Sequence, residues 1–409
     1  MKNVSIVLIL LIEFLALNSF ACTTAVVSGK YTKDGRPLLW KHRDTWSVNN
    51  KIVQFDDGKY IYIGLVNSKD TLGKYIWIGY NETGFAIMNS ASYNLNNDTI
   101  KQSGMEGSIM KKALQTCATV DDFEKLLKKL SKPTRLEANF GVIDGKGGAA
   151  YFEVSNFKVV KIDVNDPKIT PFGYVIRTNY SFTGEAGKGG GYIRYMTANN
   201  VFDELVKTGE LSAQTIIQKA SRNLTHSLTG TDLWDYASLK PGNRKMVFFY
   251  DYIPRKSSAS SCVVEGVKPD ENPALTTMWT VLGWPLASVT IPVWITKNGK
   301  QPYVLTYNES IKDAPLCHFA LTLKDRCFSY KWGTSSKYYM DINVLINADD
   351  TGIMQVLTPL DNRLFKEGYK QLEEFRKNGV NQQQPEEFYR RVDDEVLNYY
   401  KEHFGLQIE

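Results

Sequence analysis

An apolar N-terminal segment that ends at a cysteine constrains this chain more than any other feature. The chain opens with a lysine at position 2, continues through the apolar run 6–12 and reaches Ser19-Phe20-Ala21 immediately before Cys22. A basic start, an apolar stretch and small residues at positions −3 and −1 are the marks of a secretory signal peptide. We therefore expect signal peptidase to remove residues 1–21, so that the mature chain begins at Cys22 and is secreted or periplasmic.

A cysteine at the start of a mature chain carries a thiol and a free α-amine on one residue. The amine titrates near ~8 and the thiol near ~8.5, so the amine can act as the base for its own nucleophile. This arrangement is related to the pairing of threonine with its N-terminal amine in other hydrolases. The position of Cys22 therefore predicts a nucleophile.

Two other interpretations of Cys22 remain open. In the first, Cys22 is acylated and tethers a lipoprotein to a membrane. A lipobox prefers an aliphatic residue at −3 and a small residue at −2, whereas this chain has Ser19 and the bulky Phe20 there. In the second, Cys22 is an ordinary structural cysteine that happens to lie near the mature start.

Composition excludes several classes of function. Removing 21 of 409 residues leaves 388, enough for one large domain or two average ones. The hydrophobic content of 43% and the charged content of 23% are those of an ordinary globular protein. The net charge of +5 is spread along the chain without a basic block, which argues against nucleic-acid binding. After the signal segment no run of about 18 apolar residues predicts a transmembrane helix.

The remaining cysteines and the histidines give no metal motif. Cys317 and Cys327 are close enough in sequence to close a local loop, and Cys117 falls in a helical pattern that suits a small buried residue. With Cys262 they make an even number, so their disulfide pairing stays open. The four histidines lack the spacing of metal ligands, and no G-x-S-x-G motif accompanies them.

Short segments of alternating or β-branched character, separated by turn residues, dominate the chain. They predict strands over 23–27, 37–41, 51–55, 60–66, 75–80, 85–88, 138–144, 149–154, 158–163, 174–178, 245–250, 261–267 and 276–282. Amphipathic spacing predicts helices over 110–118, 123–130, 192–207 and 213–224, and one or two more from about residue 360. This order predicts an α+β protein with two sheets covered by helices.

Several motifs follow one another in a specific order between Cys22 and Ala198. They are Cys22-Thr23-Thr24, the turn 33–35, the segment 38–44, the turn 81–86 with Asn89 after it, and Arg177-Thr178-Asn179. This set resembles the N-terminal-nucleophile (Ntn) hydrolases and is most similar to the acyl-CoA:6-aminopenicillanate acyltransferase-like group. The penicillin V acylase and choloylglycine (bile-salt) hydrolase families are close relatives. The resemblance implies a four-layer αββα sandwich with a helical C-terminal extension, in a single domain over 22–409 whose catalytic half is about 22–200.

The resemblance also implies roles for individual residues. Asp44 matches the aspartate that these families keep beside the nucleophile's amine, where a carboxylate holds the amine in place. Asn89 and Asn179 match the two oxyanion-hole donors, worth ~3 kcal/mol each in the transition state. Arg194 matches a helix-borne arginine that supports the site.

One departure concerns the residues before Asp44. Bile-salt hydrolases place an arginine three residues before this aspartate, whereas this chain has Lys41 there and Arg43 next to the aspartate. We expect Lys41 and Arg43 to contact substrate, and the departure puts the bile-salt assignment in doubt.

The expected activity is cleavage of a linear amide C–N bond of a small N-acyl substrate, or transfer of its acyl group, with no metal or organic cofactor. One alternative is a dipeptidase of the related N-terminal-cysteine family, which also begins Cys-Thr. The other is a surface lipoprotein that binds amphiphiles without catalysis. The sequence leaves open the acyl chain, the amine, the balance of hydrolysis and transfer, and the oligomeric state.

Overall fold

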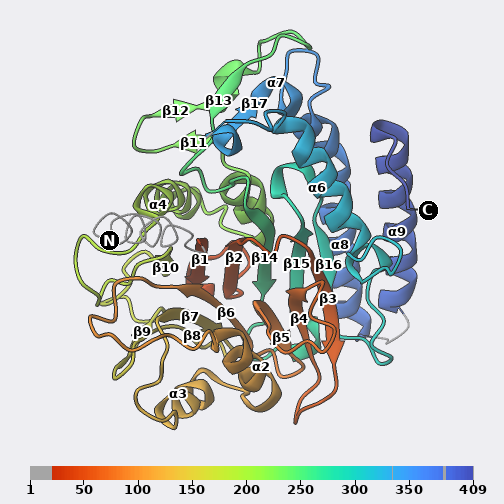
Figure 1. Cartoon of the computed structure of the whole chain (residues 1–409). Coiled ribbons are helices and arrows are strands. Elements are labelled where there is room, and N and C mark those ends of the chain that lie inside the picture. The colour runs from red at the N-terminus through yellow and green to blue at the C-terminus, as the bar shows by residue number, and fades with distance from the viewer. Residues whose placement is uncertain (1–20, 334, 381–383, 409) are drawn as a thin grey trace, which may run out of the picture.

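Two antiparallel sheets form the centre of the computed structural model, which describes residues 21–333, 335–380 and 384–408 (Figure 1). The predicted signal peptide lies outside the described residues except for Ala21. The first sheet has the strand order β10-β1-β2-β14-β15-β16 and the second the order β3-β4-β5-β6-β7-β8-β9. All strand pairs in both sheets are antiparallel.

The chain enters the six-stranded sheet first, then forms the whole seven-stranded sheet, and afterwards returns to the six-stranded sheet. The six-stranded sheet contains β1 (Cys22–Val27), β2 (Leu38–Asp44), β10 (Tyr174–Arg177), β14 (Ser258–Glu265), β15 (Thr277–Leu282) and β16 (Ile291–Val293). The seven-stranded sheet contains β3 (Asn50–Phe55), β4 (Tyr62–Asn67), β5 (Ile78–Asn81), β6 (Ala86–Ala91), β7 (Ala138–Ile143), β8 (Ala149–Val154) and β9 (Val159–Asp163).

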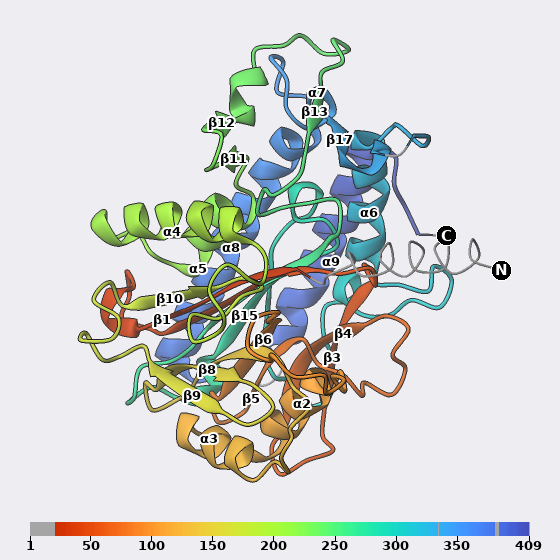
Figure 2. The same cartoon turned by 60° about the vertical axis from the view of Figure 1, so that its left-hand side comes forward.

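Helices cover the outer face of each sheet, as Figure 2 shows from the side. On the seven-stranded sheet lie α2 (Glu106–Thr116) and α3 (Val120–Lys128), and Phe123 of α3 packs edge-on against Phe152 at 5.3 Å. On the six-stranded sheet lie α4 (Tyr192–Lys207), α5 (Ala213–Thr215) and α8 (Ile353–Asn378). Trp40 of β2 stacks on Phe202 of α4 at 5.7 Å. These four layers confirm the predicted αββα architecture, and α9 (Gln384–Phe404) continues it beyond α8.

Smaller elements rise above the end of the six-stranded sheet in Figure 1. They are β11 (Thr225–His226) with β12 (Thr231–Asp232), β13 (Met246–Phe248) with β17 (Tyr339–Asp341), α6 (Pro315–Cys327) and α7 (Ile342–Leu345). The strand predicted over 245–250 therefore belongs to a separate two-stranded ribbon and not to a main sheet.

Two sequence predictions need correction. The helix predicted over 213–224 is α5 followed by a π-helix over Ile216–Ser221, and Ser221 Oγ at its end accepts a hydrogen bond from Trp40 Nε1 at 3.0 Å. A local disulfide between Cys317 and Cys327 does not form, because both lie on α6. Ten residues of α-helix separate their Cα atoms by about 15 Å, far beyond the reach of a disulfide.

Within the described residues, no helix has both the length and the apolar character required to cross a membrane.

Candidate active site

The ends of three strands meet at Cys22. This residue begins β1, and the antiparallel register pairs it with Arg43, so that Asp44 at the end of β2 lies beside the start of β1. On the other side of β1, Thr24 pairs with Arg177 of β10, and Asn179 emerges from β10 next to Cys22. The sheet topology therefore brings together residues that are 157 positions apart in sequence.

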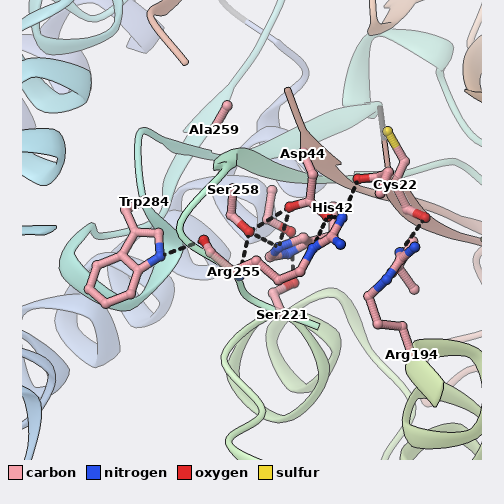
Figure 3. Close-up of polar contacts among 12 residues, drawn as sticks. Cys22, His42, Asp44, Arg194, Ser221, Arg255, Ser258, Ala259 and Trp284 are labelled. Carbon is pink, nitrogen blue, oxygen red and sulfur yellow. Dashed lines mark hydrogen bonds and ion pairs between the residues drawn. The ribbon is translucent and has the colours of Figure 1, made fainter. Parts of the chain in front are cut away.

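The backbone of Cys22 is held on both sides by polar side chains. Its nitrogen donates to Asn179 Oδ1 at 3.0 Å. Arg194 of α4 donates from Nη2 to the same Oδ1 at 2.9 Å and from Nη1 to Cys22 O at 2.7 Å and Thr23 Oγ1 at 2.8 Å. Figure 3 shows Arg194 reaching from its helix to Cys22. Cys22, Asn179 and Arg194, which the sequence predicted as site residues, thus form one hydrogen-bonded group.

The start of α4 is built to admit the Arg194 side chain. Arg194 is buried, and burial lowers its pKa to about 10. Gly191 precedes the helix with φ +88°, and a Cβ atom there would lie 2.3 Å from Arg194 Nη2 and 2.8 Å from Thr178 Cβ. Only glycine suits both this left-handed backbone and this close approach.

Asp44 lies on the helix side of the six-stranded sheet in a buried polar cluster (Figure 3). Its Oδ2 atom pairs with Arg255 Nη2 at 2.7 Å, and Ser258 Oγ donates to its Oδ1 at 2.6 Å. His42 Nε2 lies 2.9 Å from Ser258 Oγ. Burial lowers the pKa of His42 to about 4 although Asp44 raises it, so the imidazole is neutral at physiological pH.

The sequence predicted that Asp44 lies beside the nitrogen of Cys22, whereas the structure places Asn179 there. Asn179 accepts from that nitrogen, while Asp44 reaches the preceding peptide through Arg255, whose Nη2 donates to Ala21 O at 3.4 Å. Arg255 and Ser258 were not predicted. Residues 257–261 at the start of β14 are mostly serines, so the sequence pattern does not predict that Ser258 lies in a strand. No motif marks Arg255 before it.

Lys41 and Arg43 point to the opposite side of the sheet and are buried. Lys41 Nζ donates to the backbone oxygen and to Oδ1 of Asn89, both at 2.6 Å. Arg43 donates to Asn67 Oδ1 at 2.9 Å and lies over the Trp77 ring at 4.6 Å. The sequence predicted substrate contacts for both side chains, whereas the structure occupies them with protein groups.

Burial tunes the charge of Lys41. It lowers the pKa of this lysine to about 8, while the nearby Cys22 thiolate acts in the opposite direction. The protonation state of a lysine with a pKa this close to neutrality changes readily with the burial and the charges around it.

The side-chain amides of the two predicted oxyanion donors, Asn89 and Asn179, both contact protein groups. Asn179 Nδ2 donates to Ala91 O at 2.9 Å, and Asn89 contacts Lys41. Among the described residues, no hydrogen bond joins either amide to Cys22 Sγ. The same part of the chain contains no group of three or more His, Cys, Asp or Glu side chains placed to hold a metal ion.

Comparison with known proteins identifies the family of the segment that builds this site. Residues 32–227, a little under half of the chain, match the family described as acyl-coenzyme A:6-aminopenicillanic acid acyl-transferase. This match confirms the resemblance to the Ntn hydrolases and places the chain among enzymes that cleave amides or transfer acyl groups. No protein with a curated description matches the chain in sequence.

Three solved structures illustrate what the fold is similar to. A mutant of conjugated bile acid hydrolase from Clostridium perfringens is 13% identical, covers 68% of this chain and 93% of its own, and has a TM-score of 0.40. The Caenorhabditis elegans ortholog of N-acylethanolamine-hydrolyzing acid amidase is 14% identical over 61% and 94%, with a TM-score of 0.38. Penicillin V acylase from Agrobacterium tumefaciens is 12% identical over 68% and 86%, with a TM-score of 0.36.

Proposed function

We propose that this protein is exported, that the mature chain begins at Cys22, and that it cleaves a linear amide C–N bond of a small N-acyl substrate through an acyl-enzyme on Cys22. The observation that supports this proposal is the contact of Asn179 Oδ1 and Arg194 with the backbone of Cys22. The fold holds in place the one nitrogen that cleavage after Ala21 would convert into an amine.

In the proposed reaction the α-amine of Cys22 is the base. Asn179 Oδ1 would still accept a hydrogen bond from this nitrogen after cleavage, since it is 3.0 Å away in the uncut chain. Arg194 donates to the same acceptor, and its positive charge disfavours a second cation at this nitrogen.

The proton and the acyl group then move in two balanced steps. The amine takes the thiol proton, the sulfur attacks the amide carbon, and the C–N bond breaks as the leaving amine receives that proton. Water adds to the thioester, the carboxylic acid leaves and the thiol is restored. An amine in place of water would give acyl transfer.

Of the two predicted oxyanion donors, Asn89 is the one whose Nδ2 donates no hydrogen bond within the described part of the chain, whereas Asn179 Nδ2 donates to Ala91 O. Lys41 donates to both oxygens of Asn89, so the amide group has only its Nδ2 left to offer a developing oxyanion. Such a donor contributes ~3 kcal/mol to the transition state. For Asn179 the same role would require Nδ2 to leave Ala91 O.

The test begins with the mature N-terminus. Sequencing of the exported protein should read Cys-Thr-Thr, and its intact mass should show an unmodified cysteine. A diacylglyceryl group on Cys22 would contradict the mechanism and favour the lipoprotein alternative.

Activity is then measured on penicillin V, conjugated bile salts, N-acyl amino acids and dipeptides. Cys22→Ala should abolish turnover and Cys22→Ser should leave a small residue, because a hydroxyl is a weaker nucleophile than a partly ionised thiol. Cys117→Ala, which removes a buried thiol at the end of α2, is the matched control and should retain kcat. Full activity with a blocked N-terminus would place the base elsewhere, and turnover of dipeptides alone would indicate the dipeptidase alternative.

A further inference from the structure

A cavity of about 290 Å³ opens beside the peptide that precedes Cys22. Ala21, Asp44 and Arg255 form one wall, so the cavity shares residues with the site described above. Ala21 O accepts from Arg255 Nη2, and Ala21 stands between the cavity and Cys22 along the chain. Removal of residues up to Ala21 would therefore leave Arg255 Nη2 with Asp44 as its remaining acceptor and open this wall toward Cys22.

Aromatic rings make up the apolar part of the cavity wall. They are Trp46, Phe249, Tyr250 and Tyr338. Tyr250 packs edge-on against Tyr338 at 4.8 Å, and the hydrogen bond from Phe249 N to Tyr338 O at 2.7 Å joins the two segments that carry these rings. The β13–β17 ribbon thus holds the rings in place beyond the end of the six-stranded sheet.

The charged part of the wall is strongly cationic. Lys256, Lys324 and Lys337 line the cavity. Asp44 is the one carboxylate among the described lining residues, and Arg255 already neutralises it. None of the three lysines forms an ion pair within the described part of the chain.

Lys324 is the most informative of the three lysines. It lies in the last turn of α6 and is only 7% exposed, and burial lowers its pKa. The end of a helix favours a cation, but an exposed lysine would satisfy this preference at no cost in solvation. A buried lysine without an ion-pair partner is costly unless something else supplies a negative charge.

We propose that this cavity, which we call the lysine pocket, binds an anionic group carried on an aromatic or other flat apolar part of the substrate. The anion would lie against Lys324 and Lys256, and the apolar part would pack on the rings. The identity of the ligand as a substrate rests on the proposed function, whereas the binding preference of the pocket does not.

Binding to the mature protein tests the pocket by itself. The probes are 2-naphthoate and its neutral counterpart 2-naphthamide, titrated by calorimetry at low and high salt. We expect naphthoate to bind at least 10-fold more tightly than naphthamide, with a preference that falls as salt screens the lysines. Lys324→Met should reduce the preference below threefold, and Lys256→Met provides a second variant if Lys324→Met does not fold.

A matched control separates direct contact of a lysine with the anionic probe from long-range attraction by the positive charge of the surface. Lys331 is exposed, lies close enough to lower the pKa of Lys256, and does not line the pocket. Lys331→Met should leave the preference for naphthoate within twofold of wild type. Equal affinity for the two probes, or a preference that Lys324→Met does not change, would overturn the proposal.

Turnover then identifies which half of the substrate occupies the pocket. One pair of substrates is phenylacetyl-4-aminobenzoate and phenylacetyl-4-aminobenzamide, with the charge on the amine side. The other is the anilides of 4-carboxyphenylacetate and 4-carbamoylphenylacetate, with the charge on the acyl side. We expect a higher kcat/KM for the carboxylate in one pair, abolished by Lys324→Met. Turnover without preference in either pair would reject the anionic substrate, whereas selective naphthoate binding without turnover of any amide would reject the proposed function alone.

Discussion

At the scale of single residues, the site depends on two buried cations on opposite faces of the same sheet. Arg194 holds the backbone of Cys22 from the helix side, and Lys41 holds Asn89 from the side between the sheets. Each is surrounded by protein and has few alternative partners. Their charges are therefore fixed close to Cys22, and a change in either charge should appear in catalysis before it appears in folding.

Lys41 should control the alkaline limb of the pH profile. Burial lowers its pKa to about 8, so the charge and the donor to Asn89 are present below this pH and are lost above it. Lys41→Arg keeps the charge to a higher pH than lysine does, because burial lowers the pKa of the neighbouring arginine, Arg43, only to about 10. We expect kcat/KM of the wild type to fall above pH 8 and that of Lys41→Arg to stay level for at least one further pH unit. If the alkaline limbs of the two enzymes were identical, Lys41 would not be the group whose titration sets this limb.

Asn179 offers a way to separate its two contacts. Asn179→Ala removes the acceptor for Cys22 N and the Nδ2 donor together, and should lower kcat by ~10²-fold with little change in KM. Asn179→Asp keeps the acceptor oxygen, loses the Nδ2 donor and adds a negative charge beside the Cys22 nitrogen and Arg194. We expect a similar loss, since the carboxylate favours the charged form of the amine and cannot replace the lost donor. Normal kcat in Asn179→Asp would assign the residue to the amine alone, and the melting temperature of each sample shows whether folding is affected.

The sequence pointed to Cys22, Asn179 and Arg194 because their order along the chain matches a family pattern. It did not point to Arg255, whose role in the Asp44 cluster depends on where β14 lies in the sheet. The burial of Lys41 and Arg43 could not be predicted either, because their alternation with Trp40 and His42 along β2 resembles that of a strand with one exposed face. Both faces of β2 are covered in the fold.

At the scale of elements, most strands and helices follow from local pattern, but their partners do not. Residues 149–154 and 192–207 were predicted with the observed bounds, because turn glycines and caps mark their ends. The early strands looked like one series, yet β1 and β2 join one sheet and β3 joins the other. Periodicity records which side of a strand is apolar and says nothing about which strand lies beside it.

The first turn of α4 provides a prediction with a matched control. Gly191 and Gly187 both have positive φ, +88° and +77°, but only at Gly191 does a Cβ meet neighbouring atoms within 4 Å. Replacing either glycine with alanine should cost about 1 kcal/mol of stability from backbone strain. Only Gly191→Ala should displace Arg194, and we expect its kcat to fall by at least 10-fold. Equal kcat in the two variants would show that the Arg194 contacts tolerate the shift.

At the scale of the whole molecule, the end of the six-stranded sheet that carries Cys22 is separate from a second buried polar cluster at the far end of β14. Glu265 ends this strand and accepts from Trp279 Nε1 at 3.1 Å and from the Tyr369 hydroxyl at 3.4 Å. Arg376 of α8 lies 3.6 Å away. This cluster joins α8 to the sheet, so it contributes to the packing of the C-terminal helices.

Glu265 should make the stability of the molecule depend on pH. Burial, followed by the charge of Asp34, raises its pKa from 4.5 to about 7, although Arg376 and Arg36 act in the opposite direction. The folded state therefore holds a proton that the unfolded state releases between pH 4.5 and 7. The free energy of unfolding falls as pH rises through this window, by up to about 3 kcal/mol for this shift.

Glu265→Gln removes this titration while keeping the oxygen that accepts from Trp279. We expect its melting temperature to equal that of the wild type near pH 5 and to exceed it at pH 8. Glu271→Gln is the control, because Arg36 holds the pKa of Glu271 below its usual value and ionises it at both pH values. That variant should melt lower than the wild type by a similar margin at pH 5 and pH 8. A Glu265→Gln melting temperature that stays at or below the wild-type value at pH 8 would show that Arg376 compensates the buried charge.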